Sequence, residues 1–287
     1  MASKIKTAFS LIELSIVILI IGILVAGVTQ SSRLIRAIRL QAARSITTSS
    51  AVSSISNLTM WYETTSEKSI DEAERQDGIE VSRWYDITPT SVNKNDATQL
   101  TLANRPKFTD NMINGLPALK FDGTTDFFDF NGSLLVGTEY TFFIVEQRRS
   151  NADVWFIGGG SFGLDMCLHI GYYSGVNLRH AQFGDTANDC LNCFPAYTSP
   201  IPRLHIIRQS RIDGRKYYLN NSSSPTVQNT AVRSLLVSYN NAYIGRFGGG
   251  YFNGEIGEII IFSSALKNEE LKSITDYLAK KWGIKVS

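Results

Sequence analysis

The chain has 287 residues, and its 28 basic and 26 acidic residues give a formal net charge of +2 at pH 7. This balance argues against a polyanionic partner, so we expect no nucleic-acid ligand. Charged residues account for only 19% and aromatic residues for 11%, with 22 glycines. That composition favours an exported β-rich domain over a helical cytosolic enzyme.

An apolar segment runs from Phe9 to Val28 and contains one charged residue, Glu13. At about 1.5 Å of rise per residue, a helix of this length is about 30 Å long, the thickness of a bilayer's hydrocarbon core. We therefore predict a transmembrane helix. Lys4 and Lys6 precede it, so the positive-inside rule places the N-terminus in the cytoplasm. A carboxylate in such a helix costs about 2.5–3.5 kcal/mol, so Glu13 requires a partner.

The residues Phe9-Ser10-Leu11-Ile12-Glu13-Leu14, after a short basic leader and a small residue, resemble the N-terminus of type IV prepilins and pseudopilins. The resemblance implies a leader over residues 1–8, cleavage by a prepilin peptidase between Ala8 and Phe9, and methylation of the new Phe9 amine. It also implies that Glu13 pairs with this amine on a neighbouring pilin or pseudopilin subunit in the inner membrane. The family usually has Gly before the cut, where this chain has Ala8.

Two other interpretations of this segment remain open. A secretory signal peptide would use Lys4 and Lys6 as its basic region and residues 25–27 as a small-residue cleavage site, although Glu13 is unusual in the apolar region of such a peptide. A plain membrane anchor would carry Glu13 incidentally.

Helical periodicity continues beyond the apolar segment. Ile35, Ile38, Ala42 and Ile46 fall on one face at spacings of three and four. We assign the helical arm to residues 9–56. Its last part is rich in Ser and Thr, whose helix propensity is modest, so this part needs to pack against the following domain.

Residues 57–287 are predicted to form an antiparallel β-sandwich of the jelly-roll type with a C-terminal helix, so the fold class is mainly β. Short segments rich in Val, Ile, Phe and Tyr alternate with Gly, Asn, Asp and Pro, which is typical of such sandwiches. The predicted strands include residues 118–121, 140–145, 204–208, 216–219, 242–245 and 256–262. The last of these is apolar on both faces, so it should be central, and strict alternation places Ile256 and Glu258 on one face.

The final helix is predicted from an apolar stripe formed by Leu271, Ile274, Leu278 and Trp282. Asn268 is the expected N-cap, and Gly283 suits the left-handed position at the C-terminal end.

Several ordered segments together resemble the concanavalin A-like, laminin-G-type domain of bacterial surface proteins. They are residues 58–63, 81–86, 104–108, 114–123, 243–245 and 252–262, and the helix that closes on Lys281-Trp282-Gly283. The resemblance covers most of residues 58–286. It implies a lectin-like sandwich whose loops often bind calcium and glycans.

Catalytic residues are not evident in the sequence. Glycosidases on related sandwiches place acidic residues alternately along one strand, aimed at the sugar. Glu255-Ile256-Gly257-Glu258 is the nearest match, but Gly257 replaces the middle acid and the two glutamates should face opposite ways. We therefore predict that the protein is not an enzyme.

The cysteines are Cys167, Cys190 and Cys193. In an oxidising periplasm we expect one disulfide, either Cys190–Cys193 or Cys167 with one of these, and no metal site. The bond would pin the loop over residues 185–202.

The same loop carries Asp185, Asn188 and Asp189. Their oxygens suit calcium, the one cofactor considered, or sugar hydroxyls, and the alternative is ordinary turn chemistry.

Together these features predict a minor pilin or pseudopilin of a type IV pilus or type II secretion system that presents a lectin-like domain to a glycan or another cell-surface ligand. It would lie in the inner membrane with a periplasmic C-terminal domain, or at the cell surface in an assembled pilus. One alternative is a membrane-tethered glycan-active enzyme on the same scaffold. Another is a membrane-anchored binding protein outside any filament.

Overall fold

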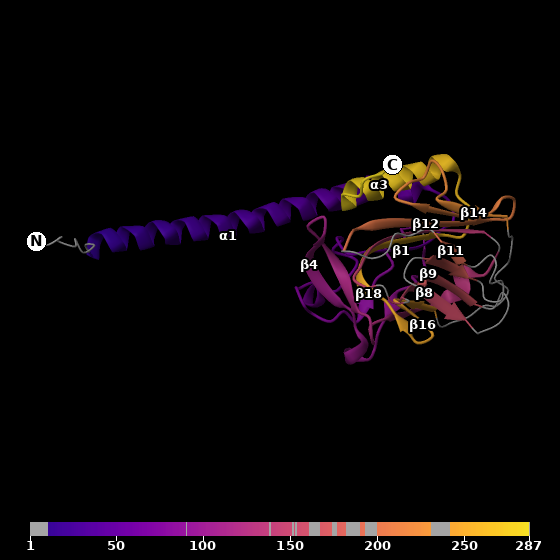
Figure 1. The fold of residues 1–287 in the computed structure, drawn as a ribbon, viewed down its shortest axis with the longest axis horizontal. Helices are drawn as coiled ribbons and strands as arrows, with labels where there is room; N and C mark the ends of the chain where they lie inside the picture. Colours follow the sequence, from indigo (N-terminus) through magenta and orange to yellow (C-terminus); the bar gives the residue numbers. More distant parts are fainter. Residues whose placement is uncertain are drawn as a thin grey trace, which may run out of the picture. The chain divides into compact units, whose positions relative to one another are not determined.

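The computed structural model describes residues 11–286 apart from residues 90, 138, 151, 153, 161–166, 174–176, 182–189, 193–199 and 231–241. The chain divides after Ala42 into two compact units. The first contains most of helix α1 (Leu11–Thr48), and the second contains all the described strands and helix α3 (Asn268–Trp282) (Figure 1). Four short 3₁₀ helices complete the second unit: η1 (Ala51–Ser54), η2 (Glu72–Glu74), η3 (Leu102–Asn104) and η4 (Gly132–Leu135).

Helix α1 ends earlier than the predicted arm, at Thr48 instead of residue 56. Near this end the hydroxyls of Thr48 and Ser49 donate to the carbonyl oxygens of Arg44 and Ser45 at 2.9 Å. Such side-chain bonds compete with the helical backbone and favour its end. Within the described part of the chain, none of the helices combines the length and apolar content that crossing a membrane requires. The transmembrane helix predicted over residues 9–28 is therefore not borne out.

The described strands form two antiparallel sheets in a sandwich-like arrangement. In sheet A the strand order is β14 (Val227–Asn229), β13 (Gly214–Leu219), β12 (Arg203–Ser210), β7 (Tyr140–Arg148), β18 (Asn253–Phe262), β5 (Leu116–Asp122) and β4 (Lys107–Ile113), and β1 (Leu58–Glu63) also pairs with β18. In sheet B it is β11 (Cys190–Asn192), β10 (Asn177–Ala181), β9 (Cys167–Tyr173), β8 (Val154–Gly160), β15 (Ala242–Ile244), β6 (Phe128–Phe130), β3 (Ala97–Thr98) and β2 (Arg83–Trp84). A small hairpin, β16 (Arg246–Phe247) and β17 (Gly250–Tyr251), completes the set. The mainly β prediction with a C-terminal helix is confirmed.

Successive side chains of β7 point into two different apolar cores. Phe142 and Ile144 belong to the apolar core between the sheets, whereas Phe143 and Val145 face a second core under α3. Strand β18 is central, as predicted, because β1, β5 and β7 all pair with it.

The phase of β18 differs from the prediction. A bulge between Ile256 and Glu258 adds one residue opposite β7, so Ile256 and Ile259 both face the core between the sheets. Glu258 instead faces α3, and the Cβ of any larger residue at position 257 would lie 2.6 Å from the Trp282 ring. A period-two pattern cannot reveal an inserted residue of this kind.

Helix α3 packs along sheet A (Figure 1), and its predicted stripe of Leu271, Ile274, Leu278 and Trp282 is fully buried. Gly283 takes the left-handed conformation with φ of 65°, as expected. The N-cap is Lys267 instead of Asn268, because the Glu270 carboxylate accepts the Lys267 backbone N–H at 2.8 Å and caps the helix one residue earlier.

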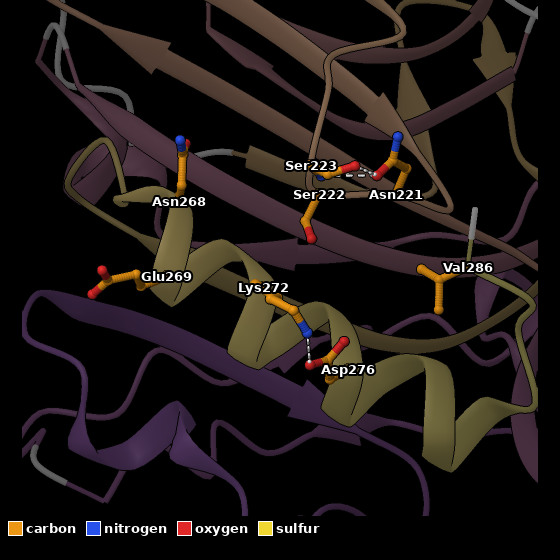
Figure 2. Close-up of a pocket in the computed structure, with 8 residues that line it drawn as sticks. All are labelled: Asn221, Ser222, Ser223, Asn268, Glu269, Lys272, Asp276 and Val286. Carbon is orange, nitrogen blue, oxygen red and sulfur yellow. Dashed lines mark hydrogen bonds and ion pairs between the residues drawn. The ribbon is translucent and has the colours of Figure 1, made fainter.

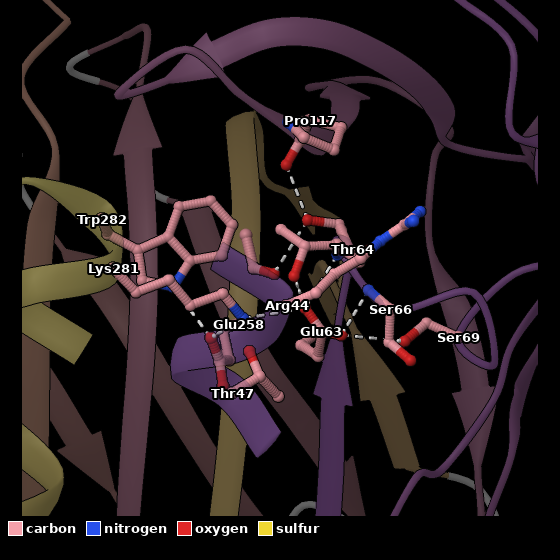
Figure 3. A network of polar contacts seen from close by, with 12 residues as sticks. Arg44, Thr47, Glu63, Thr64, Ser66, Ser69, Pro117, Glu258, Lys281 and Trp282 are labelled. Atoms are coloured by element: carbon pink, nitrogen blue, oxygen red, sulfur yellow. Dashed lines mark hydrogen bonds and ion pairs between the residues drawn. The ribbon is translucent and has the colours of Figure 1, made fainter. Parts of the chain in front are cut away.

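A buried ionic network fixes α3 to sheet A (Figure 3). The Lys281 ammonium lies 2.8 Å from Glu63 Oε2 on β1 and 2.9 Å from Glu258 Oε2 on β18, and all three side chains are buried. The indole N–H groups of Trp61 and Trp282 each donate to Glu258 at 2.8 Å. Burial alone would lower the pKa of Lys281, but the two carboxylates outweigh it and hold that pKa above its usual value.

The same contacts set the pH range in which the network stabilises the fold. Burial opposes ionisation of Glu63, yet Lys281 and the hydrogen bonds from Thr65 lower the pKa of that carboxyl. A lowered carboxyl pKa gives stability that is present above the unfolded value of about 4.3 and is lost as the pH falls. A raised lysine pKa gives stability that is present below about 10.4 and is lost as the pH rises.

We predict that Lys281→Ala lowers the free energy of unfolding by about 3–5 kcal/mol, because it leaves two carboxylates buried without a cation. Urea denaturation at pH 7 measures the change. Lys280→Ala is the matched control, since Lys280 is the exposed neighbour in the same helix. Equal losses for the two variants would contradict a central role for the network.

Candidate functional site

Most of the predicted site residues lie outside the described residues. These are Ala8, Phe9, Asp185, Asn188, Asp189 and Cys193. Glu13 and Cys190 lie in described elements, α1 and β11, but their side chains lie outside the description. The processing, calcium and disulfide predictions therefore stay predictions.

Two of the three cysteines can be located in the structure, Cys190 by its backbone and Cys167 by its side chain. Cys190–Asn192 forms strand β11 at an edge of sheet B, paired with β10, so this part of the predicted loop is a strand. Cys167 is buried at the start of β9, with Sγ 3.8 Å from His169 Nδ1. Across the described residues, no group of three or more His, Cys, Asp or Glu side chains is arranged to hold a metal ion.

A polar cluster lies buried between the sheets around Glu146 and His205. The Tyr172 hydroxyl donates to Glu146 Oε1 at 2.7 Å, and His205 Nε2 lies 2.8 Å from the same oxygen. Burial and the Glu146 charge raise the pKa of Tyr172 well above its usual value, so this phenol is not activated as a nucleophile. His205 is fully buried in this cluster, and its contacts suit a structural role.

The outer face of sheet B carries a row of polar and aromatic side chains at matching register. Cross-strand pairing joins Arg83 to Thr98, Thr98 to Asp129, Asp129 to Tyr243, and Tyr243 to Gly158. Their strand neighbours, which include Trp84, Ala97, Phe128 and Ala242, are buried in the core between the sheets. Since side chains alternate across a strand, the row faces away from that core.

A pocket of about 380 Å³ opens beside this row. It is lined by Arg83, Lys94, Asn95, Asp96, Thr98, Asp129, Phe130 and Asn131. A second hollow of about 450 Å³ shares Lys94, Asn95 and Asn131 with it and continues toward Val92 and Leu134. Volumes of this size fall within the range of small-molecule sites.

Charged groups in this pocket have distinct surroundings. Arg83 lies 3.7 Å from Asp96 Oδ2 and stacks over the Tyr85 ring at 5.4 Å. Burial raises the pKa of Asp129, and the positive charge of Arg246 partly opposes the shift. The pocket thus holds an arginine, a lysine, one ion-paired carboxylate and one carboxyl group whose pKa is raised by burial.

The β16–β17 hairpin packs on the outer face next to the row. Glycine at position 158 permits this, since an added Cβ would lie 2.4 Å from Arg246 O and 2.5 Å from Phe247 Cβ. The Phe247 ring stacks on His169 with centroids 4.3 Å apart and meets Trp155 edge-on at 5.7 Å. The hairpin therefore covers β8 and β9, and the row from Arg83 to Tyr243 lies beside the hairpin.

Another pocket, of about 470 Å³, lies between α3 and the β13–β14 connection (Figure 2). Its lining comprises Asn221, Ser222, Ser223, Asn268, Glu269, Lys272, Asp276 and Val286. Figure 2 shows Lys272 paired with Asp276 across one turn of α3, at 2.6 Å. No aromatic side chain is among the residues lining this pocket.

Sequence reasoning missed the residues on the outer face of sheet B. A local signal exists, because Asp129 stands between Phe128 and Phe130 and period-two alternation places it opposite the core. That signal does not reveal that β2, β3, β6 and β15 lie side by side, since these strands are 2 or 3 residues long and distant in sequence.

Comparisons with known proteins found solved structures of low similarity. No family model matches, and no curated protein does. Trypanosoma rangeli sialidase shares 12% identity over 79% of this chain and 33% of its own, with a TM-score of 0.48. The CBM40 domain of Ruminococcus gnavus IT-sialidase shares 14% identity over 55% of this chain and 96% of its own, with a TM-score of 0.43. The chain thus spans about a third of the sialidase's length.

These comparisons correct one prediction. We expected no enzyme, yet sialidases are among the structural neighbours, so the prediction that the chain is not an enzyme is wrong as a statement drawn from its fold. The comparisons give no support to the prepilin resemblance.

We predict that Gly158→Ala displaces the β16–β17 hairpin and lowers the free energy of unfolding by about 1–3 kcal/mol, the usual cost of overpacking. Guanidinium denaturation followed by tryptophan fluorescence measures the free energy. A change in the emission of the folded protein reports the displaced hairpin, because Trp155, one of the four tryptophans, contacts the hairpin residue Phe247. Gly249→Ala is the matched control, since an added Cβ there has nothing within 4 Å. A wild-type unfolding curve for Gly158→Ala would contradict the close packing of hairpin and sheet.

Proposed function

We propose that the β-sandwich is a carbohydrate-binding or glycan-active domain whose site is the outer-face pocket of sheet B. The observation that carries this proposal is the row from Arg83 to Tyr243. Arg83, Thr98 and Asp129 of this row line one pocket, and Tyr243 lies beside Asp129 on the neighbouring strand. Sugars offer hydroxyl groups that pair with charged and polar side chains, and apolar C–H faces that pack on aromatic rings.

The other outer face of the sandwich is less suitable. Helix α3 and the segment around Val52 pack on sheet A and bury its apolar side chains, among them Phe143 and Ile260. Sheet B carries no such helix over β2, β3, β6 and β15 among the described residues. The open face and the pocket therefore coincide.

The choice of first ligands is supported by the neighbours' own complexes. Trypanosoma rangeli sialidase has been solved with sialic acid, and the Ruminococcus gnavus CBM40 domain with α2,6-sialyllactose. We propose sialylated and neutral oligosaccharides as the first compounds to test on this chain.

A second, catalytic form of the proposal is favoured by one observation. Asp96 and Asp129 line the same pocket, and glycosidic cleavage requires two carboxyl groups around the scissile bond. Burial raises the pKa of Asp129, which favours the protonated form that a general acid needs. In this form of the proposal Asp129 protonates the leaving oxygen, and Asp96 is the second carboxylate.

We predict that Arg83→Gln weakens binding of the best ligand on a glycan array at least about tenfold, because a charged hydrogen bond is worth about 1.5–3 kcal/mol. If the full-length chain releases product, detected by mass spectrometry, Asp129→Asn should reduce that rate at least about 100-fold. Arg211→Gln, an exposed arginine in the β12–β13 turn, is the matched control. Wild-type binding by Arg83→Gln and Asp129→Asn together would place the site elsewhere.

We also propose a role for the N-terminal helix, which rests on the sequence and on one structural observation. Large apolar side chains along α1 are exposed, for example Leu11 at 86%, Leu24 at 62% and Ile38 at 59%. Exposed apolar surface of this extent calls for an apolar partner. In this proposal the chain is processed like a prepilin and α1 packs on related subunits of a type IV pilus or type II secretion system, so that the sandwich is displayed outside the inner membrane.

The corresponding prediction concerns the mature N-terminus. Mass spectrometry of protein from its native host should show a chain that begins at N-methylated Phe9. Glu13→Ala should lower incorporation into filaments while the cellular amount of protein stays constant, with Ser15→Ala as the control on the same helix. A mature chain that begins near Val28, or an intact Met1, would exclude this proposal.

A further inference from the structure

Arg246 occupies an unusual position at the start of the β16–β17 hairpin. Gly245 precedes it with φ of 87°, and the Cβ of any other residue there would lie 2.6 Å from the Phe121 ring. This fixed turn directs the Arg246 side chain onto a group of three aromatic rings. The distances from the guanidinium carbon to the ring centroids are 4.7 Å for Phe127, 5.1 Å for Tyr243 and 5.4 Å for Tyr251.

The rings hold this guanidinium without satisfying its hydrogen-bonding capacity. The Nε–H of Arg246 is buried and has no hydrogen-bond partner. Over the described part of the chain, Arg246 also makes no ion pair within 4.0 Å. Cation–π contacts engage the faces of the group, whereas its five N–H donors point along its edges in a planar fork. The two Nη groups also have no hydrogen-bond partner among the described residues, and unlike Nε they are not buried, so they are the donors that an anion can reach.

Asp129, whose pKa is affected by the charge of Arg246, does not take that role. Asp129 is the cross-strand partner of Tyr243 and is close enough to feel the charge of Arg246, yet the two form no ion pair among the described contacts. The acceptor that matches the guanidinium fork is a carboxylate from outside the chain, because two oxygens at carboxylate spacing accept two parallel N–H bonds.

We propose that Arg246, Tyr243 and Tyr251 form a subsite for an acidic sugar unit, whose carboxylate pairs with the guanidinium while its ring packs on the tyrosines. This inference rests on the proposed glycan-binding function and names the class of glycan. The subsite adjoins the sheet B pocket through the Tyr243–Asp129 pair. An acidic unit here leaves the neighbouring units of the same oligosaccharide in the pocket of Arg83 and Thr98.

The aromatic rings favour a sugar acid over a peptide carboxylate. Tyr243 and Tyr251 are half-buried, so part of each ring faces solvent beside the guanidinium. A pyranose presents a rigid apolar face to such rings, whereas an Asp or Glu side chain brings a flexible chain whose ordering costs entropy.

The test compares two sugars that differ only in the carboxylate, methyl β-D-glucuronide and methyl β-D-glucoside, titrated into the full-length chain by calorimetry. We expect the glucuronide to bind at least ten times more tightly. Arg246→Gln should reduce glucuronide binding to the level of the glucoside. Arg246→Lys should keep part of the preference, since it keeps the charge and loses the fork. Arg211→Gln is the matched control and should leave both affinities unchanged.

Each other outcome is decisive. Equal binding of the two sugars by the wild type overturns the acidic subsite and leaves the glycan-binding proposal standing. Binding of neither sugar, nor of any array glycan, overturns both. Parallel loss of both sugars in Arg246→Gln and Arg246→Lys, with unchanged circular dichroism, shows that Arg246 only supports the face and refutes the subsite. Equally tight binding of a polyglutamate peptide refutes the assignment to a sugar.

Discussion

A single buried ammonium group joins the C-terminal helix to the central strands of sheet A. Lys281 lies between Glu63 on β1 and Glu258 on β18. The Glu258 carboxylate also accepts hydrogen bonds from the indoles of Trp61 and Trp282 and from the Tyr277 hydroxyl. Charges this deeply buried are tolerated only when every partner is in place. This requirement fixes the position of α3 on sheet A. It therefore also determines that α3 covers the outer face of sheet A.

Because α3 covers sheet A, the outer face of sheet B remains as the surface that can bind a ligand. Short strands β2, β3, β6 and β15 bring Arg83, Thr98, Asp129 and Tyr243 into one row. The hairpin that carries Arg246 is seated on the same face because positions 158 and 245 lack a side chain. The packing of α3 on sheet A and the arrangement of side chains on sheet B thus depend on the same sandwich geometry.

The strongest local patterns predicted their elements correctly. The apolar stripe of α3 is buried as expected, and the central position of β18 follows from its two apolar faces. The phase of β18 was wrong because a bulge at Gly257 adds one residue, and the N-cap was wrong because the Glu270 side chain reaches the Lys267 N–H. Both errors come from interactions that the pattern of apolar residues does not encode.

The sequence by itself determined the mainly β class, the positions of the longer strands and the amphipathic face of the last helix, because each depends on a repeat contained in a few neighbouring residues. The tertiary structure alone decided which residues meet on sheet B and that Arg246 meets three rings from β15, β17 and the segment before β6. Strands of two or three residues carry too little periodicity to specify their partners. Their order is set by the packing of the whole sandwich, and so is the candidate site.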